Sequence, residues 1–143
     1  MKNKTLPLLA IVILAACTEK KQGTTPPEKT VEAFKTLHPK AVIEKWNDEP
    51  PIWEAKYSEG SEKGAVSFDQ KNDVTETELV LSENALPNLE AIKGYITANY
   101  PKERILRCEK IVKTAGDTTY EIQITGKELI FDTAGNFIAE EPD

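Results

Sequence analysis

The stretch Trp53-Glu54-Ala55-Lys56-Tyr57 decides the fold of this chain. Its large or apolar residues alternate with charged ones, which is the period-two pattern of a β-strand with one buried face and one solvent-exposed face. Tyr120-Glu121-Ile122-Gln123-Ile124 shows the same alternation in the second half of the chain. We expect the large or apolar residues of both stretches to pack under helices. They are Trp53, Ala55 and Tyr57 in the first stretch and Tyr120, Ile122 and Ile124 in the second. The residues expected on the opposite, exposed face are Glu54, Lys56, Glu121 and Gln123.

Further strands and turns flank these two stretches. Runs rich in β-branched and aromatic residues predict strands at 42–46, 65–68, 74–81, 104–112, 128–131 and 136–139. Phe68-Asp69-Gln70-Lys71-Asn72 and Phe131-Asp132-Thr133-Ala134-Gly135 are typical of hairpin turns, and Asn, like Gly, tolerates a left-handed backbone. Asp69, Asn72 and Asp73 also resemble a calcium loop, but Lys71 stands where an oxygen ligand belongs. The hairpin is the preferred interpretation.

Two helices precede the two sets of strands. Val31, Phe34 and Leu37 recur at helical spacing, as do Leu89, Ile92 and Ile96 further along the chain. Thr25-Pro26-Pro27-Glu28 matches a capping box that would start the first helix, and Pro39 and Pro101 end the two helices. His38-Pro39-Lys40 also corresponds to Tyr100-Pro101-Lys102. We therefore predict an α+β tandem repeat, 28–81 and 86–140, with one helix and about four antiparallel strands in each repeat and the helices on one face of the sheet.

These motifs carry a resemblance to a known family. A helix ending in an aromatic residue and Pro, a strand beginning Trp-Glu or Tyr-Glu and a Phe-Asp-x-x-Gly hairpin resemble the PepSY-like, beta-lactamase-inhibitor-like (BLIP-like) lipoproteins of Bacteroidetes-type bacteria. The resemblance covers about residues 28–140, with Asn72 and His38 departing from the pattern. It implies a two-repeat α+β fold and a non-enzymatic binding or inhibitory role. Beta-lactamase inhibitor proteins bind across an open sheet, which points to the same exposed face.

The first residues have the features of an export signal. Lys2 and Lys4 precede an apolar run that is too short to span a bilayer. Leu14-Ala15-Ala16-Cys17 resembles a bacterial lipobox, which predicts a signal peptide at 1–16, lipidation of Cys17, a flexible tether at 17–27 and a folded domain at 28–143. An ordinary signal peptide followed by an unmodified cysteine is the alternative. Thr18 replaces the Asp of inner-membrane retention, which favours the outer membrane, facing the periplasm.

The composition excludes several classes of function. The chain has 143 residues, with 18 Lys and Arg against 24 Asp and Glu and a net charge of −6. Loss of Lys2 and Lys4 with the signal peptide would change the net charge to −8. Like charge opposes binding to nucleic acid or anionic lipid. One His and two Cys exclude most zinc frameworks and multi-disulfide scaffolds. We expect no metal and no cofactor.

Individual residues suggest no catalytic site, so we predict that the protein is not an enzyme. His38 has no nucleophile or acid placed beside it in the sequence, and a structural role at a helix end suffices. Cys108 is expected to be a buried small hydrophobe, with a reactive thiol as the alternative. Trp46 and Trp53 are expected in the core, or as partner anchors if they face outward. Residues 140–143 form an acidic tail that we expect to be solvated.

The sequence favours a lipid-anchored binding module of the cell envelope. Its membrane contact would be the lipid on Cys17, and its partner a protein or peptide recognised or inhibited through the exposed face that carries Glu54, Lys56, Glu121 and Gln123. A small-ligand or cation sensor is the alternative, favoured by the negative charge. A merely solvated sheet face is the third possibility.

Overall fold

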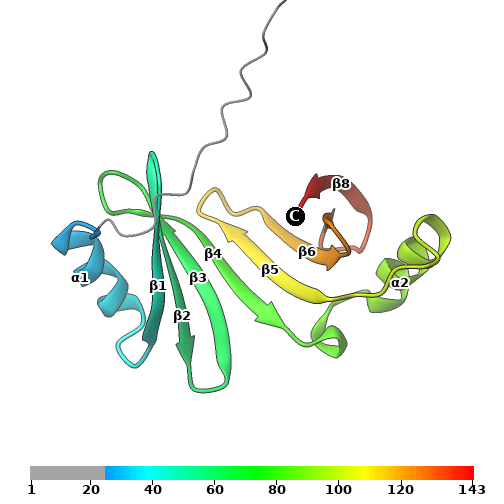
Figure 1. Cartoon of the computed structure of the whole chain (residues 1–143), viewed down its shortest axis with the longest axis horizontal. Coiled ribbons are helices and arrows are strands. Elements are labelled where there is room, and N and C mark those ends of the chain that lie inside the picture. Colours follow the sequence, from blue (N-terminus) through cyan, green and yellow to red (C-terminus); the bar gives the residue numbers. More distant parts are fainter. Residues whose placement is uncertain (1–24) are drawn as a thin grey trace, which may run out of the picture.

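The computed structural model describes residues 25–143, which form one antiparallel sheet of eight strands and two α-helices (Figure 1). The strands neighbour one another in chain order from β1 to β8. The helices are α1 (Glu28–Leu37) and α2 (Leu89–Asn99), and a short 3₁₀ helix, η1 (Glu83–Ala85), precedes α2. The strands are β1 (Val42–Glu49), β2 (Ile52–Glu59), β3 (Glu62–Phe68), β4 (Val74–Leu81), β5 (Arg107–Lys113), β6 (Thr118–Ile124), β7 (Lys127–Phe131) and β8 (Phe137–Pro142).

The predicted tandem repeat of one helix and about four strands is wrong. The sheet is continuous, because β4 pairs with β5 from Glu76↔Lys113 to Leu81↔Cys108, as every other pair of neighbours does. A boundary after residue 81 would leave backbone N–H and C=O groups of β4 unpaired, and such a free edge is costly and prone to aggregation. Pairing with β5 satisfies these groups. Residues 28–81 and 86–140 are therefore parts of a single sheet and not two units.

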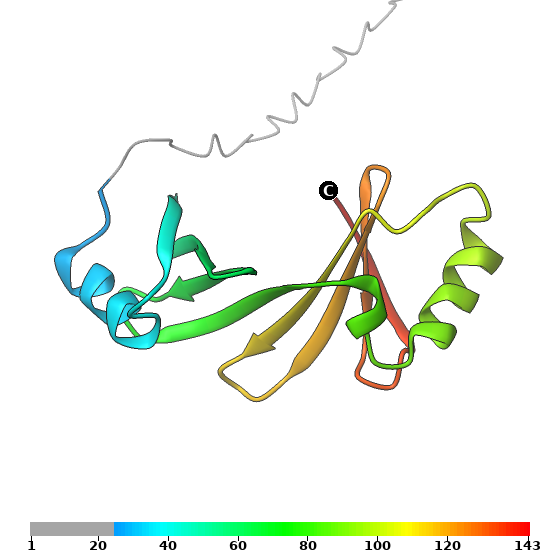
Figure 2. The same ribbon diagram turned by 90° about the horizontal axis from the view of Figure 1, so that it is seen from below.

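Both helices lie on the same side of this sheet. Directly paired residues share a face, and the pairs Val66↔Thr77 and Thr77↔Val112 follow one face from β3 to β5. Leu81 lies on that face too, four residues along β4 from Thr77, and pairs with Cys108. The apolar clusters under α1 and α2 therefore use the same side of the sheet. The two helices flank opposite ends of the sheet (Figures 1 and 2).

The core consists of two apolar clusters, one under each helix. Under α1, the buried Phe34 packs with residues of β2 and β3, namely Ala55, Tyr57, Val66 and Phe68. Under α2, Ile92 and Ile96 pack with residues of β5, β6 and β7, namely Cys108, Tyr120, Ile122, Ile124, Leu129 and Phe131. Each large side chain buried in this way contributes about 1.5–3 kcal/mol.

The alternation predicted for β2 and β6 is confirmed at five of six apolar positions. Trp53 is the exception, since it is only half-buried and lies outside both clusters. It is the second residue of β2 and pairs with Asp48 of β1 and Phe68 of β3, near one end of both ladders. The side chains that follow the prediction are Ala55, Tyr57, Tyr120, Ile122 and Ile124.

Both predicted hairpin turns are confirmed. The Asp69 carboxylate accepts the backbone N–H groups of Lys71 (2.8 Å) and Asp73 (3.0 Å). Asp132 accepts those of Ala134 (2.9 Å) and Asn136 (2.8 Å) in the same manner. Asn72 and Gly135 occupy the left-handed positions, with φ of 70° and 83°. Asp69 is therefore a turn residue, held by the backbone that it caps.

The predicted capping box is wrong. Helix α1 begins at Glu28, with Pro27 as its N-cap and no side-chain cap bond. The ring of Pro27 disfavours helical backbone at the residue before it, so Pro26 cannot open the helix. Pro26 is already buried, so packing begins before residue 28.

The predicted signal peptide, Cys17 and the start of the tether lie outside the described residues. Neither helix of residues 25–143 is long and apolar enough to span a bilayer.

Candidate functional site: the concave sheet face

The sheet face opposite the helices contains a polar hollow of roughly 330 Å³. We call the sheet face opposite the helices the concave face. All four residues predicted to lie on the exposed face line it. The lining residues are Glu49, Glu54, Lys56, Glu78, Arg107, Glu109, Glu121, Gln123, Glu128 and Asp143.

Curvature of the sheet brings these residues together. Glu49 ends β1 at one edge of the sheet, and Asp143 follows β8 at the other edge. In a flat sheet the outer strands of eight would lie about 34 Å apart, at about 4.8 Å per strand. One hollow bordered by both residues requires a sheet that curls toward this side, as the ribbon does in Figure 1.

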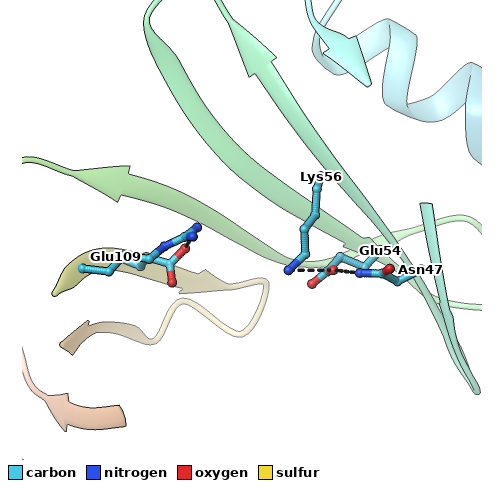
Figure 3. A network of polar contacts seen from close by, with 5 residues as sticks. Asn47, Glu54, Lys56 and Glu109 are labelled. Carbon is cyan, nitrogen blue, oxygen red and sulfur yellow. Dashed lines mark hydrogen bonds and ion pairs between the residues drawn. The ribbon is translucent and has the colours of Figure 1, made fainter. Parts of the chain in front are cut away.

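Glu54 is the most deeply placed carboxylate of the concave face. Its residue is only 8% exposed, although the alternation predicted an exposed position. The Asn47 amide donates a hydrogen bond to Glu54 Oε1 (2.5 Å), and Lys56 Nζ lies 3.6 Å from the same oxygen (Figure 3). Two polar partners compensate for the desolvation of this charge. Glu54 is therefore a fixed part of the face and not a solvated side chain.

Both cationic side chains of the hollow are already engaged. Lys56 pairs with Glu54, and Arg107 Nη2 lies 2.7 Å from Glu109 Oε1. Figure 3 shows Glu109 on a strand apart from Asn47, Glu54 and Lys56, so the two groups are separate. Beyond these pairs, the charge of Lys56 opposes the rise in the pKa of Glu78, and the charge of Arg107 opposes the rise in the pKa of Glu128.

Two carboxylates with shifted pKa values lie near the middle of the sheet. Burial, with the nearby charges of Glu54 and Glu109, raises the pKa of Glu78 to about 7. Burial, with the charges of Glu128 and Glu109, raises the pKa of Glu121 to about 7. Desolvation and neighbouring carboxylates both disfavour the ionised form. At neutral pH these two side chains are therefore partly protonated.

The carboxylates of β6 and β7 are also close enough to repel one another. Burial and the charges of Asp143 and Glu109 raise the pKa of Glu128. Within residues 25–143, no ion pair joins Glu78, Glu121 or Glu128 to a basic side chain. The concave face thus holds three carboxylates, Glu78, Glu121 and Glu128, that have no ion pair of their own within residues 25–143.

Sequence reasoning missed six of the ten lining residues. The alternation of Val74–Leu81 places Glu76 and Glu78 on one face, but only the register with β3 decides which face. Glu109 and Glu128 needed the same register information. Glu140, Glu141 and Asp143 are exposed, as predicted, but they do not form a separate tail: Glu140 and Glu141 belong to β8, and Glu140 accepts hydrogen bonds from the Tyr100 hydroxyl and from Lys127.

The other two candidate residues, His38 and Cys108, have contacts that suit a structural role. His38 Nδ1 lies 3.1 Å from Glu59 Oε2, and its ring packs on Phe34 and Tyr57 at the end of α1. Cys108 is 2% exposed, and burial raises the pKa of its thiol to about 11, so the reactive thiolate is disfavoured. Among residues 25–143, no group of three or more His, Cys, Asp or Glu side chains could hold a metal ion.

No protein-family model and no curated protein matches this chain. Several solved structures share its fold. A BLIP-like protein from Bacteroides fragilis has 24% identity and a TM-score of 0.65, over 84% of this chain and 89% of that one. A Bacteroides eggerthii protein whose name refers to the periplasm has 12% identity and a TM-score of 0.72, over 83% and 90%. A DUF2874 family protein from Bacteroides ovatus has 18% identity and a TM-score of 0.70, over 84% and 89%.

At these identities the likeness establishes the fold alone. The resemblance to BLIP-like proteins is confirmed at that level. The PepSY-like relationship and the lipid anchor stay predictions from the sequence.

Proposed function

We propose that this protein is a lipid-anchored binding module of the cell envelope, which recognises a protein or peptide partner on its concave face and catalyses no reaction. One observation carries the proposal: polar side chains from six strands converge on a single hollow. A sheet face that served only to be solvated would need neither a buried carboxylate nor its two partners, since a buried charge is costly unless it is paired.

The chemistry of the concave face favours a macromolecular partner over an apolar ligand. Small-molecule sites are lined mainly by hydrophobic and aromatic side chains, whereas nine of the ten lining residues here carry a charged group and the tenth is Gln123. Charged surfaces of this kind suit specific recognition of a complementary charged surface. The names of the Bacteroides neighbours agree with a BLIP-like module and with the periplasm.

Photo-crosslinking from the two sides of the sheet tests the proposal. A photoreactive amino acid replaces Lys56 on the concave face in one variant and the exposed Lys35 of α1 in the matched control. We expect a defined adduct in intact cells from the Lys56 position alone. Glu121→Lys should abolish this adduct. The protein captured in it should also bind the purified chain in solution. The same adducts from both positions, or none from the concave face, would contradict the proposal.

The anchor has its own test. Replacing Cys17→Ala should move the protein from the membrane pellet to the soluble fraction, because stable anchoring at this point depends on acyl chains. A variant that stays in the pellet through a salt wash is held by something other than lipid.

A small-ligand or cation sensor is the second candidate, favoured by the seven acidic side chains of the concave face, although no three of the described side chains are grouped as a metal site by themselves. A ligand that binds only the folded state raises Tm. Addition of calcium should then raise Tm in the native chain and not in Glu78→Gln/Glu121→Gln. A Tm that calcium leaves unchanged would rule this candidate out.

A further inference from the structure

We propose that the concave face docks an extended, Lys- or Arg-rich segment of its partner, whose cationic groups pair with Glu78, Glu121 and Glu128, the lining carboxylates shown above to have no ion pair within residues 25–143. This inference rests on the proposed function and specifies the chemistry of the partner. It follows from the shape of an unpartnered sheet face, from its charge and from the placement of its few cations.

The charge of the concave face is strongly one-sided. Seven of the ten lining residues are acidic and two are basic. Both basic residues, Lys56 and Arg107, already pair with carboxylates of the same face. An acidic or neutral partner would cover Glu78, Glu121 and Glu128 without supplying an ion pair, which is costly at any interface. A cationic partner supplies the missing charge.

The other lysines of residues 25–143 that form ion pairs hold other carboxylates. Lys63, Lys93 and Lys113 pair with Glu44, Glu83 and Glu76, at 3.4, 2.5 and 3.7 Å. Lys127 lies 2.9 Å from Glu140. The raised pKa values of Glu78 and Glu121 show that their ionised forms are unfavourable in the free protein. A partner that pairs with them would relieve this strain, so its binding should be coupled to proton release near neutral pH.

The distribution of the carboxylates favours an extended segment over a single ion. They come from β1, β2, β4, β5, β6 and β7 and from the residue after β8, and they line the hollow between the two edges of the sheet. No three of them are gathered as a metal site would require. Successive side chains of an extended peptide lie about 3.3 Å apart along the backbone and can reach carboxylates on several strands.

The test uses the purified full chain and fluorescently labelled hexalysine as the probe, followed by anisotropy at low ionic strength and about pH 8. The face variant is Glu78→Gln/Glu121→Gln. The matched control is Glu32→Gln/Glu90→Gln, which makes the same change in net charge at exposed positions of the two helices. We expect the face variant to weaken binding about tenfold and the control to weaken it less than about twofold. Because Gln relieves repulsion, the face variant should remain folded, which circular dichroism checks.

Two further measurements separate a docking site from general attraction to an acidic protein. Calorimetry in buffers of different ionisation enthalpy should show proton release when hexalysine binds at about pH 7, and the face variant should lose this release. Labelled hexaglutamate should not bind. Equal weakening by both variant pairs, no proton release, or no binding of hexalysine would overturn the inference. If a partner is nevertheless crosslinked from the Lys56 position, the proposed function stands and only the cationic chemistry fails.

Discussion

The two faces of the same sheet make opposite contributions to this protein. On the helix side, Ala55 and Ile122 are fully buried in apolar clusters that stabilise the fold. Their sequence neighbours Glu54 and Glu121 point to the other side, where burial places carboxylates beside carboxylates. Neighbouring residues of one strand therefore contribute differently to the stability of the fold. The concave face, which contributes less to stability than the helix side, is the better candidate for binding. Four predictions test this contrast.

The largest effect is expected in the core under the helices. Replacing Phe34→Ala should lower the free energy of unfolding by about 3–5 kcal/mol, and Ile92→Ala by about 2–5 kcal/mol, because each leaves a cavity in a buried cluster. Leu37→Ala is the control on α1, since Leu37 is 51% exposed and its loss should matter little. Urea unfolding followed by circular dichroism measures all three. Equal losses of unfolding free energy for Phe34→Ala and Leu37→Ala would contradict the idea that the buried cluster under α1 stabilises the fold.

The second effect concerns the buried Glu54 of the concave face and its hydrogen-bond partner Asn47. Asn47→Ala should cost about 1–3 kcal/mol, because Glu54 then keeps its burial and loses a hydrogen-bond partner. Lys56→Ala should cost less than about 1 kcal/mol, since its ion pair with Glu54 is longer and Lys56 is exposed. A double-mutant cycle of Asn47→Ala with Glu54→Ala should give a coupling energy. A coupling near zero would mean that the hydrogen bond does not hold Glu54.

The third effect is a pH dependence with a defined sign. Glu78 and Glu121 have folded-state pKa values of about 7, above those of an unfolded chain near 4.5, so the folded state binds more protons between these values. The protein should therefore become more stable as the pH falls from about 7 to about 4.5. Allowing for the solvent that reaches both side chains, we expect a gain of roughly 1–2 kcal/mol.

The isosteric variant checks the origin of this gain. Glu78→Gln/Glu121→Gln should be more stable than the native chain at about pH 8 and should have a flatter pH profile, because its side chains cannot ionise. The midpoint of urea unfolding between about pH 5 and pH 8 is the measurement. A native chain that loses stability as the pH falls through this range would contradict the assignment.

The smallest effect on stability is expected from a charge exchange across the concave face. Lys56→Glu combined with Glu121→Lys keeps the net charge and should change the free energy of unfolding by less than about 1 kcal/mol. Binding of a partner captured at this face should nevertheless fall, because the pattern of charge is altered. If thermal unfolding and binding are both unchanged, the concave face is not the binding surface.

Local patterns in the sequence were sufficient for much of the fold. Alternation placed Tyr57 and Ile124 under the helices, since the period of a strand depends only on neighbouring residues. The two Asp turns were equally readable, because Asp69 and Asp132 bond to backbone groups within four residues. The same local argument failed for Trp53, which is only half-buried, and for Glu54, which is buried with Asn47 and Lys56 against its carboxylate.

By itself, then, the sequence determined the strands, the hairpin turns and the side of each strand that faces the helices, because these follow from contacts close along the chain. Only the tertiary structure decided that β4 pairs with β5 to make one sheet, and that this sheet curls until Glu49 and Asp143 border the same hollow. Curvature accumulates from the twist of every strand, and register sets which carboxylates meet. Both are sums over residues far apart in the chain, which no local pattern contains.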